Sequence, residues 1–302
     1  MNREQATEQA RQASIAAWAE AQRKALHEAV RNNPVGPVAA AAGASGTGSG
    51  GANTLPGLYG VASDGLIYSL DNFTNLPFDY IPFPSPPAVC NGGDGYIYAV
   101  VDYGEIAFVS INIATGELLF YVNDISDFSQ KGASSLYREE SGSFIYVDNG
   151  SKKSSITNII RITIDGPGTA SATLVNSVDA SVTGEFFLKQ LYLVDGSVWA
   201  TSLAIDFYEL TGPFDIDTGQ FTQQPYQIET ALKNGEPLDI HWITSCVQNN
   251  GIIYIYAIYD GASSIGLFRF DIEGGYPTWI KDGIISDVIP EFTNAITTIF
   301  NI

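Results

Sequence analysis

Basic and sulfur-containing residues are scarce in this sequence. Its 302 residues include only 14 Lys and Arg, two His, two Cys and one Met, against 33 Asp and Glu. A formal charge of −19 repels phosphates, which excludes a DNA- or RNA-binding surface and disfavours contact with anionic lipid. The two cysteines, Cys90 and Cys246, lie far apart and match no zinc-binding spacing. We therefore expect no nucleic-acid partner, no membrane contact, no metal site and no cofactor.

Long apolar runs and known catalytic motifs are also absent. No stretch of about 18 apolar residues occurs, and the polar first 30 residues lack the basic and apolar regions of a secretory signal. A spanning helix and classical export are therefore not expected. The sequence has no Gly-x-Ser-x-Gly elbow, no phosphate-binding loop with lysine and no dinucleotide fingerprint. No motif predicts a reaction.

Aromatic residues, by contrast, are abundant. Phe, Trp and Tyr make up 12% of the chain, and 45% of all residues are hydrophobic. Aromatic residues are enriched in strands, so this composition favours a folded, sheet-rich protein. The charge is unevenly placed, because residues 57–302 hold nine Lys and Arg against 29 Asp and Glu. The sheet-rich part is therefore the acidic part.

Residues 1–33 form the first of three segments and predict one α-helix over residues 3–32. Asn2 is placed as N-cap, and Asn32-Asn33-Pro34 ends the helix. One side carries large apolar residues among small ones: Ile15, Trp18, Leu26 and Val30 beside Ala10, Ala13 and Ala17. A single helix cannot bury such a stripe alone. The helix is therefore expected to anchor the chain on a partner: the rest of this chain, a second copy of it, or another protein.

Residues 34–56 form the second segment, which has the composition of a linker. It contains no charged residue and consists mostly of Ala, Gly, Ser and Pro. The helix is therefore expected to be tethered to the rest of the chain.

Residues 57–302 form the third segment and contain repeats. Four units share a plan of apolar strand, Gly-containing turn, aromatic strand, third strand, second turn and fourth strand. The first turn of successive units is marked by Gly57, Gly95, Gly142, Gly196 and Gly251, at spacings close to the roughly 40–50 residues of a four-stranded propeller blade. The first unit, from residue 57, is one strand short. The run AITTIF (295–300) is available to complete it.

Three turns carry a resemblance to β-propeller repeats. They are NIATG (112–116), DIDTG (215–219) and DIEGG (271–275), which are similar to the Asp-x-x-Gly turns that join the outer strands of bacterial and viral propellers. The resemblance implies an all-β, five-bladed propeller over residues 57–302, closed by the C-terminal strand. A β-sandwich or six blades remain the alternatives.

Polar residues on the first strand of each unit would line the channel of a propeller. Asp239 with Glu139 or Glu140 offers a carboxylate pair for glycoside hydrolysis, which needs two acids about 5–10 Å apart. His241 is expected to be a structural hydrogen-bonding residue. Asp residues in the turns, such as Asp148 and Asp215, are expected to cap the turn backbone and not to bind calcium. The aromatic candidates for stacking on glycans, or for packing between blades, are Tyr103, Tyr226 and Tyr276.

The tethered helix and the missing catalytic motifs together predict a non-enzymatic structural or attachment protein of a large assembly. The layout resembles a bacteriophage virion protein of the tail, baseplate, fibre adaptor or capsid decoration. The expected location is the virion, or the cytoplasm if the protein is not viral. The two alternatives are a glycan-binding, lectin-like propeller and a propeller-fold glycoside hydrolase.

Overall fold

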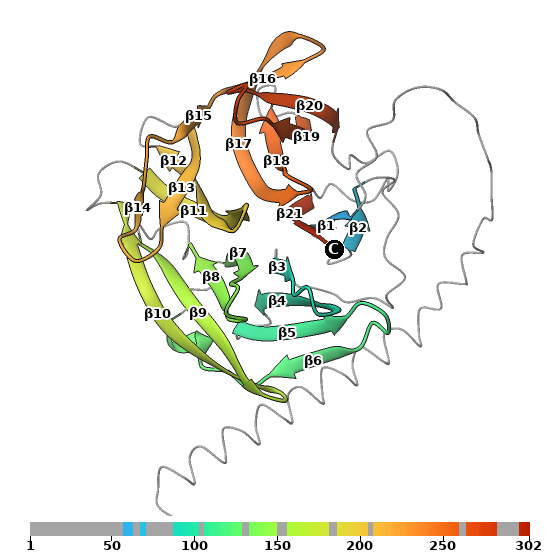
Figure 1. The fold of residues 1–302 in the computed structure, drawn as a ribbon, viewed down its shortest axis with the longest axis vertical. Coiled ribbons are helices and arrows are strands. Elements are labelled where there is room, and N and C mark those ends of the chain that lie inside the picture. Colours follow the sequence, from blue (N-terminus) through green and yellow to red (C-terminus); the bar gives the residue numbers. More distant parts are fainter. Residues whose placement is uncertain are drawn as a thin grey trace, which may run out of the picture. The chain divides into compact units, whose positions relative to one another are not determined.

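The protein is an all-β, five-bladed propeller, shown in Figure 1 by a computed structural model. The structure describes residues 57–62, 67–70, 87–102, 106–128, 133–149, 156–180, 186–204, 208–259, 264–282 and 296–302. The helix expected over residues 3–32 and the linker expected over 34–56 lie outside the described residues. The propeller predicted from the repeats is confirmed.

The second and third blades are four-stranded antiparallel meanders, as the repeats predict. Blade 2 consists of β3 (Ala88–Asn91), β4 (Tyr96–Asp102), β5 (Ile106–Asn112) and β6 (Leu118–Tyr121). A 3₁₀ helix, η1 (Ile125–Asp127), follows it. Blade 3 consists of β7 (Ala133–Arg138), β8 (Phe144–Asp148), β9 (Ile156–Gly166) and β10 (Thr169–Asp179).

The fourth and fifth blades contain more strands than the repeats predict. Blade 4 consists of β11 (Phe186–Val194), β12 (Ser197–Ala204) and β13 (Glu209–Asp215), with β14 (Gln220–Phe221) and β15 (Tyr226–Ile228) both paired to β13. Blade 5 consists of β17 (Glu236–Asn249), β18 (Ile252–Tyr259), β19 (Ser264–Phe270) and β20 (Pro277–Asp282). A further strand, β16 (Thr230–Lys233), pairs with β17 and meets β20 at one register position.

The first blade joins the two ends of the propeller. Its described strands lie in the order β2 (Ile67–Ser69), β1 (Leu58–Ala62), β21 (Ile296–Asn301). The C-terminal strand pairs antiparallel with β1, with Tyr59 opposite Phe300. The prediction that the run 295–300 completes the first unit is therefore confirmed. The run FDYIPF (78–83), which the repeat plan makes the last strand of the first unit, lies outside the described residues.

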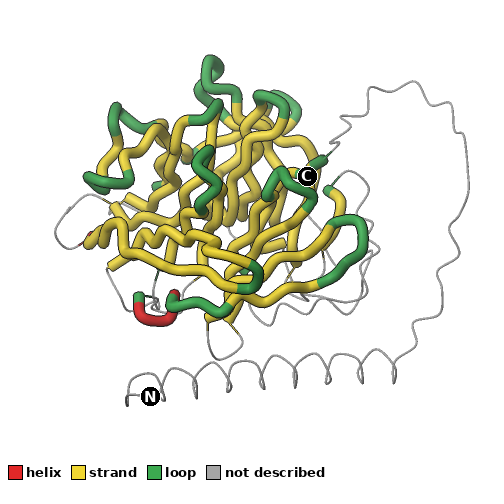
Figure 2. Tube along the Cα trace, turned by 60° about the horizontal axis from the view of Figure 1, so that its bottom comes forward, coloured by secondary structure: helices red, strands yellow, loops and turns green. Residues whose placement is uncertain are grey.

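Tight turns connect the first two strands of blades 4 and 5. Asp195 and Gly196 have φ of 49° and 78°, and Asn250 and Gly251 have φ of 51° and 75°. Two successive positive φ values define a type I′ turn, which matches the twist of a hairpin and favours Asn-Gly or Asp-Gly. Figure 2 shows the strands of the propeller in yellow and the loops and turns that join them in green.

Buried residues form five separate hydrophobic clusters, one at each contact between neighbouring blades. Blades 2 and 3 meet through Tyr98, Phe108 and Phe144, whose rings lie 4.5–5.8 Å apart. Blades 5 and 1 meet through Tyr256, Leu58 and Ile299. Because each blade is buried on both faces, its strands read as nearly continuous apolar runs. No helix of the described part is long and apolar enough to cross a membrane.

Candidate functional site

The innermost strand of each blade faces the central channel. These strands are β3, β7, β11, β17 and β21, which surround the middle of the propeller in Figure 1. Between them lies a cavity of about 230 Å³. Each of the five strands contributes lining residues, so the cavity exists only when β21 has closed the ring.

A β-bulge recurs at one register position in four of these strands. At the bulge the inner strand has one extra residue relative to the strand it pairs with: Ser134 in β7, Lys189 in β11, Thr244 in β17 and Thr297 in β21. A bulge re-aims the side chain that follows it. The following residues are Ser135, Gln190, Ser245 and Thr298, and all four line the cavity.

The residue after each bulge makes a hydrogen bond to the inner strand of the next blade. Ser135 Oγ accepts the N–H of Leu191 at 2.8 Å, and Gln190 Oε1 accepts that of Cys246 at 2.8 Å. Ser245 Oγ accepts the N–H of Ile299 at 3.0 Å. We call these side chains, with Thr298, the latch residues. They connect blades 3, 4, 5 and 1 in sequence around the channel.

The ring continues from blade 1 into blade 2. Thr298 Oγ1 donates to the carbonyl of Pro87 at 2.8 Å, just before β3. In β3 the latch position is occupied by Ala88, seven residues before Gly95, as Ser135 is seven before Gly142. Alanine has no polar side-chain atom, so blade 2 makes no latch of this kind.

Arg138 connects blades 2 and 3 instead. Its Nη1 donates to the carbonyl of Gly92 and lies 2.9 Å from Asp94 Oδ2. Both partners belong to the turn after β3, and Arg138 ends β7. A charged side chain therefore joins the two blades that lack a latch.

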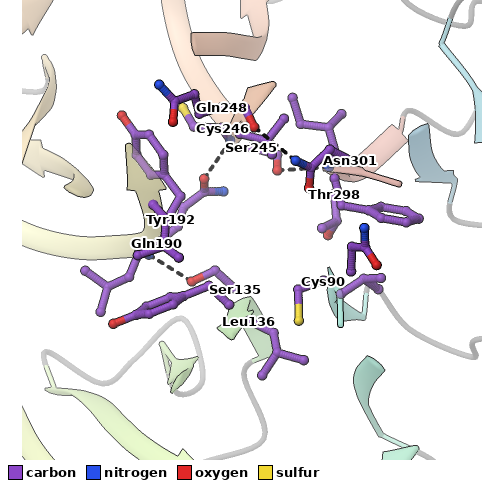
Figure 3. A pocket seen from close by; sticks show the side chains of 18 of the residues that line it. Cys90, Ser135, Leu136, Gln190, Tyr192, Ser245, Cys246, Gln248, Thr298 and Asn301 are labelled. Carbon is purple, nitrogen blue, oxygen red and sulfur yellow. Dashed lines mark hydrogen bonds between the residues drawn. The ribbon is translucent and has the colours of Figure 1, made fainter. Parts of the chain in front are cut away.

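The cavity lining mixes apolar side chains with hydrogen-bonding ones and is almost free of charge. Its amides and hydroxyls come from Asn91, Ser135, Gln190, Ser245, Gln248, Thr298 and Asn301, and its one charged side chain is Arg138, which Asp94 neutralises. No carboxylate lines the cavity among the described residues. Figure 3 shows Cys90, Ser135, Gln190, Ser245 and Thr298 arranged around this space. The arrangement suits a neutral ligand with hydrogen-bonding groups.

The two cysteines also line the cavity. Cys90 and Cys246 are free thiols in β3 and β17. Burial raises the pKa of both thiols well above the usual range. A thiol reacts as the thiolate, so these side chains act here as small apolar groups and not as nucleophiles.

A buried ion pair lies between blades 4 and 5. Lys189 Nζ is 2.6 Å from Glu209 Oε1 and 2.6 Å from the carbonyl of Ile243. Glu209 Oε1 also accepts the N–H of Ile243, while Glu209 Oε2 is buried without a hydrogen-bond partner. Burial lowers the pKa of Lys189 and raises that of Glu209, and the mutual attraction opposes both shifts. The Trp242 ring covers Lys189 Nζ, at 3.6 Å from its centroid.

The structure does not bring the expected carboxylate pair together. Glu139 follows the end of β7 and accepts two hydrogen bonds from Arg161, at 2.9 and 3.1 Å. Glu140 is exposed in the same turn, whereas Asp239 and His241 are exposed in the first half of β17. The inner strands run parallel, so these groups lie toward opposite ends of the channel.

Two of the expected glycan-stacking aromatics are described. Tyr226 stacks on Trp199 at 6.1 Å and meets Phe270 edge-on at 5.5 Å, which places it between blades 4 and 5. Tyr276 is 58% exposed in the turn before β20. The remaining candidates lie outside the described residues: Tyr103 and the helix positions Ala10, Ala13, Ile15, Ala17, Trp18, Leu26 and Val30.

Of the two Asp residues expected to cap turns, Asp215 binds its own backbone, whereas Asp148 is the buried last residue of β8. Asp215 Oδ1 accepts the N–H of Asp217 at 2.9 Å and that of Thr218 at 3.3 Å. Asn112 makes the same contacts in blade 2. Within the described part of the chain, no three His, Cys, Asp or Glu side chains are grouped to hold a metal ion.

No protein-family model matches the chain, and no curated protein matches it. Solved structures do. A luciferin-regenerating enzyme is 14% identical, with a TM-score of 0.39 over 69% of this chain and 62% of that one. The Bacteroides ovatus xyloglucan PUL protein GH43B is 15% identical, with a TM-score of 0.44 over 68% and 43%. The native Bacillus subtilis arabinanase is 14% identical, with a TM-score of 0.40 over 66% and 81%. This chain thus spans less than two thirds of the first two proteins.

These comparisons correct the expectation of a non-enzymatic component of a phage virion. Several of the similar solved structures belong to enzymes, among them a GH43 protein and an arabinanase. On this finding the prediction of a virion attachment protein is wrong, and so is the prediction that the chain is not an enzyme. Low sequence identity and TM-scores below 0.5 carry no substrate or reaction over to this chain.

Proposed function

We propose that the central channel binds a carbohydrate. The observation that carries this proposal is the neutral, hydrogen-bonding lining of a cavity inside an acidic domain. Residues 57–302 hold 29 Asp and Glu, yet none of the described ones lines the cavity. A site for a cation would be expected to use some of them, and a site for an anion would need an uncompensated Arg or Lys.

The latch residues retain hydrogen-bonding capacity for a ligand. Ser135 and Ser245 accept a backbone N–H, and each hydroxyl keeps its own proton to donate. Gln190 Nε2 donates to the carbonyl of Thr244 and has a second proton. Because backbone contacts fix these side chains, little rotamer entropy is lost when a ligand binds.

The cavity size limits the ligand. A volume of about 230 Å³ is below the roughly 300–1,000 Å³ of sites for drug-sized ligands. It suits one sugar unit. The proposal therefore takes up the carbohydrate-binding alternative raised from the sequence, and binding of this kind is also the first step in a propeller glycoside hydrolase.

Calorimetric titration of the full chain with neutral sugars tests the proposal. The probes are xylose, arabinose, glucose and galactose, together with xylo-, arabino-, cello- and malto-hexaose. Binding of at least one sugar is expected, and Asn301→Ala should weaken it about tenfold. Gln220→Ala, which changes an exposed amide in β14, should leave it unchanged. No binding of any probe at millimolar concentration would contradict the proposal.

The same solutions are assayed for release of new reducing ends. Glycoside hydrolysis requires two carboxyl groups about 5–10 Å apart, and the described cavity lining supplies none. The proposal is therefore one of binding, and hydrolysis is measured directly. Release of reducing ends by the wild type that Asn301→Ala reduces would show that the bound sugar is a substrate.

A further inference from the structure

Two large aromatic side chains are exposed at one register position on neighbouring inner strands. Phe187 in β11 is 43% exposed, and Trp242 in β17 is 41% exposed. They are 55 positions apart, the same spacing as the latch residues Gln190 and Ser245. Each is followed by a buried residue and then by the bulge of its strand. The repeat therefore places the two aromatic residues at equivalent positions on β11 and β17, which are adjacent in Figure 1.

The ammonium group of Lys189 holds one face of the Trp242 ring. Lys189 Nζ lies 3.6 Å from the centroid of the indole ring, and the Lys189 side chain is only 10% exposed. Glu209 and the Ile243 carbonyl bind the same ammonium group at 2.6 Å. A cation–π contact is stronger when the ammonium group is removed from water, as it is here. The inner face of the indole is thus occupied, and its outer face is presented to solvent in a fixed orientation.

A buried ion pair is a costly way to stabilise a fold. Taking two charges out of water costs several kcal/mol per ion, and well-packed apolar residues often do as well or better. The Lys189–Glu209 pair also leaves Glu209 Oε2 buried without a hydrogen bond. Besides binding the backbone of Ile243 in blade 5, the pair places its ammonium group against an exposed tryptophan.

The aromatic pair lies away from the latch cavity along the channel. Ser245, the first residue of β17 that lines the cavity, follows Trp242 by three residues of strand, or about 10 Å. Asp239 and His241 are exposed beside Trp242 on β17. Aromatic faces next to polar side chains match the two kinds of surface on a sugar ring, its C–H face and its hydroxyl edge.

We propose that Phe187 and Trp242 form a stacking platform for a second sugar unit, with Lys189 and Glu209 as positioning residues. This inference rests on the proposed carbohydrate ligand and adds a separate site to it. A chain of several sugars would contact both the platform and the cavity. A single sugar would bind in the cavity alone.

The test compares the tightest-binding hexaose of the panel with its monosaccharide. Trp242→Ala and Phe187→Ala should each weaken hexaose binding about tenfold, since an aromatic contact contributes about 0.5–1.5 kcal/mol beyond its buried area. Monosaccharide binding should not change. Trp242→Phe should restore most of the affinity. Tyr276→Ala, which removes an exposed aromatic from a turn, is the matched control and should have no effect.

Tryptophan fluorescence gives a second readout. Trp242 is more exposed than the buried Trp199 and the half-buried Trp279, so acrylamide should quench it more than these two, and hexaose should protect it. The difference between wild type and Trp242→Ala isolates this signal from that of Trp18. If hexaose binds equally well to wild type, Trp242→Ala and Phe187→Ala, the platform is refuted while the cavity proposal stands. If no sugar binds the wild type, both proposals fail.

The positioning role has its own measurement. Glu209→Gln should leave monosaccharide binding unchanged, weaken hexaose binding and increase acrylamide quenching of Trp242, because Lys189 is no longer held beneath the indole. Unchanged quenching together with unchanged hexaose binding would remove Lys189 and Glu209 from the proposal.

Discussion

The hydroxyl of Ser245 in β17 accepts the backbone N–H of Ile299 in β21 at 3.0 Å, and this bond ties the last strand of the chain to the fifth blade. Both groups are buried. The contact is one of a series, because Ser135 and Gln190 bind the next blade at the equivalent position. Closure of the ring therefore depends on side chains that also line the channel.

Removing this hydroxyl should destabilise the propeller. In Ser245→Ala the N–H of Ile299 is left buried without a partner, which costs about 1–3 kcal/mol. For a domain of this size the melting temperature should fall by about 2–4 °C per kcal/mol. Ser245→Thr keeps the hydroxyl and is the control. Equal melting temperatures for wild type and Ser245→Ala would show that the bond contributes nothing.

Removing the C-terminal strand should have a larger effect. Without residues 296–302, β1 loses one of its two partner strands, and the edges of β17 and β3 are uncovered. An exposed hydrophobic strand edge is a template for association with other chains. Size-exclusion chromatography should show loss of the monomer peak or soluble aggregates. Deletion of Ile302 alone retains all of β21 and should preserve the wild-type profile.

Replacing a turn glycine by alanine should destabilise the fold where the glycine has a positive φ and should not do so elsewhere. Gly251 has φ of 75° in the turn between β17 and β18, so Gly251→Ala should destabilise the fold by about 1–2 kcal/mol, although no atom lies near its Cβ position. Gly274 does not have a positive φ, and its nearest neighbour would lie 3.7 Å from a Cβ. Gly274→Ala should be neutral or slightly stabilising. Equal effects in urea unfolding would contradict this argument.

The Lys189–Glu209 pair should make stability depend on pH. The folded-state pKa of Glu209 is raised above 4.5, so just above that pH the folded state binds more protons and stability falls as pH rises. The folded-state pKa of Lys189 is lowered below 10.5, so just below that pH the unfolded state binds more protons and stability rises with pH.

Glu209→Gln separates these two effects. It should abolish the fall above pH 4.5 and steepen the rise toward pH 10.5, because Lys189 loses its counter-charge and its pKa falls further. Breaking a buried pair on one side should also cost about 3–5 kcal/mol near neutral pH. Urea unfolding at a series of pH values measures the fall above pH 4.5, the rise toward pH 10.5 and the loss of stability near neutral pH. If the unfolding free energies of wild type and Glu209→Gln change with pH in the same way, Lys189 and Glu209 do not cause the pH dependence.

The sequence by itself determined the propeller. The recurrence of Gly95, Gly142, Gly196 and Gly251 predicted the blades, because each of these glycines has the positive φ of a hairpin turn. The need for a positive φ in a turn is a local requirement. The short first unit and the β-rich run near residue 300 indicated how the ring closes. Those signals depend only on neighbours in the chain.

The channel was decided by the tertiary structure. Each bulge depends on the register between two strands, so nothing local marks Ser134, Lys189 or Thr244 as the extra residue. The repeats predict that polar residues of the first strands line the channel, but the bulges decide which of these residues face the cavity. The same holds for Trp242, whose partner Lys189 lies in another blade 53 positions away. Contacts between blades form only on closure, and the candidate sites consist of such contacts.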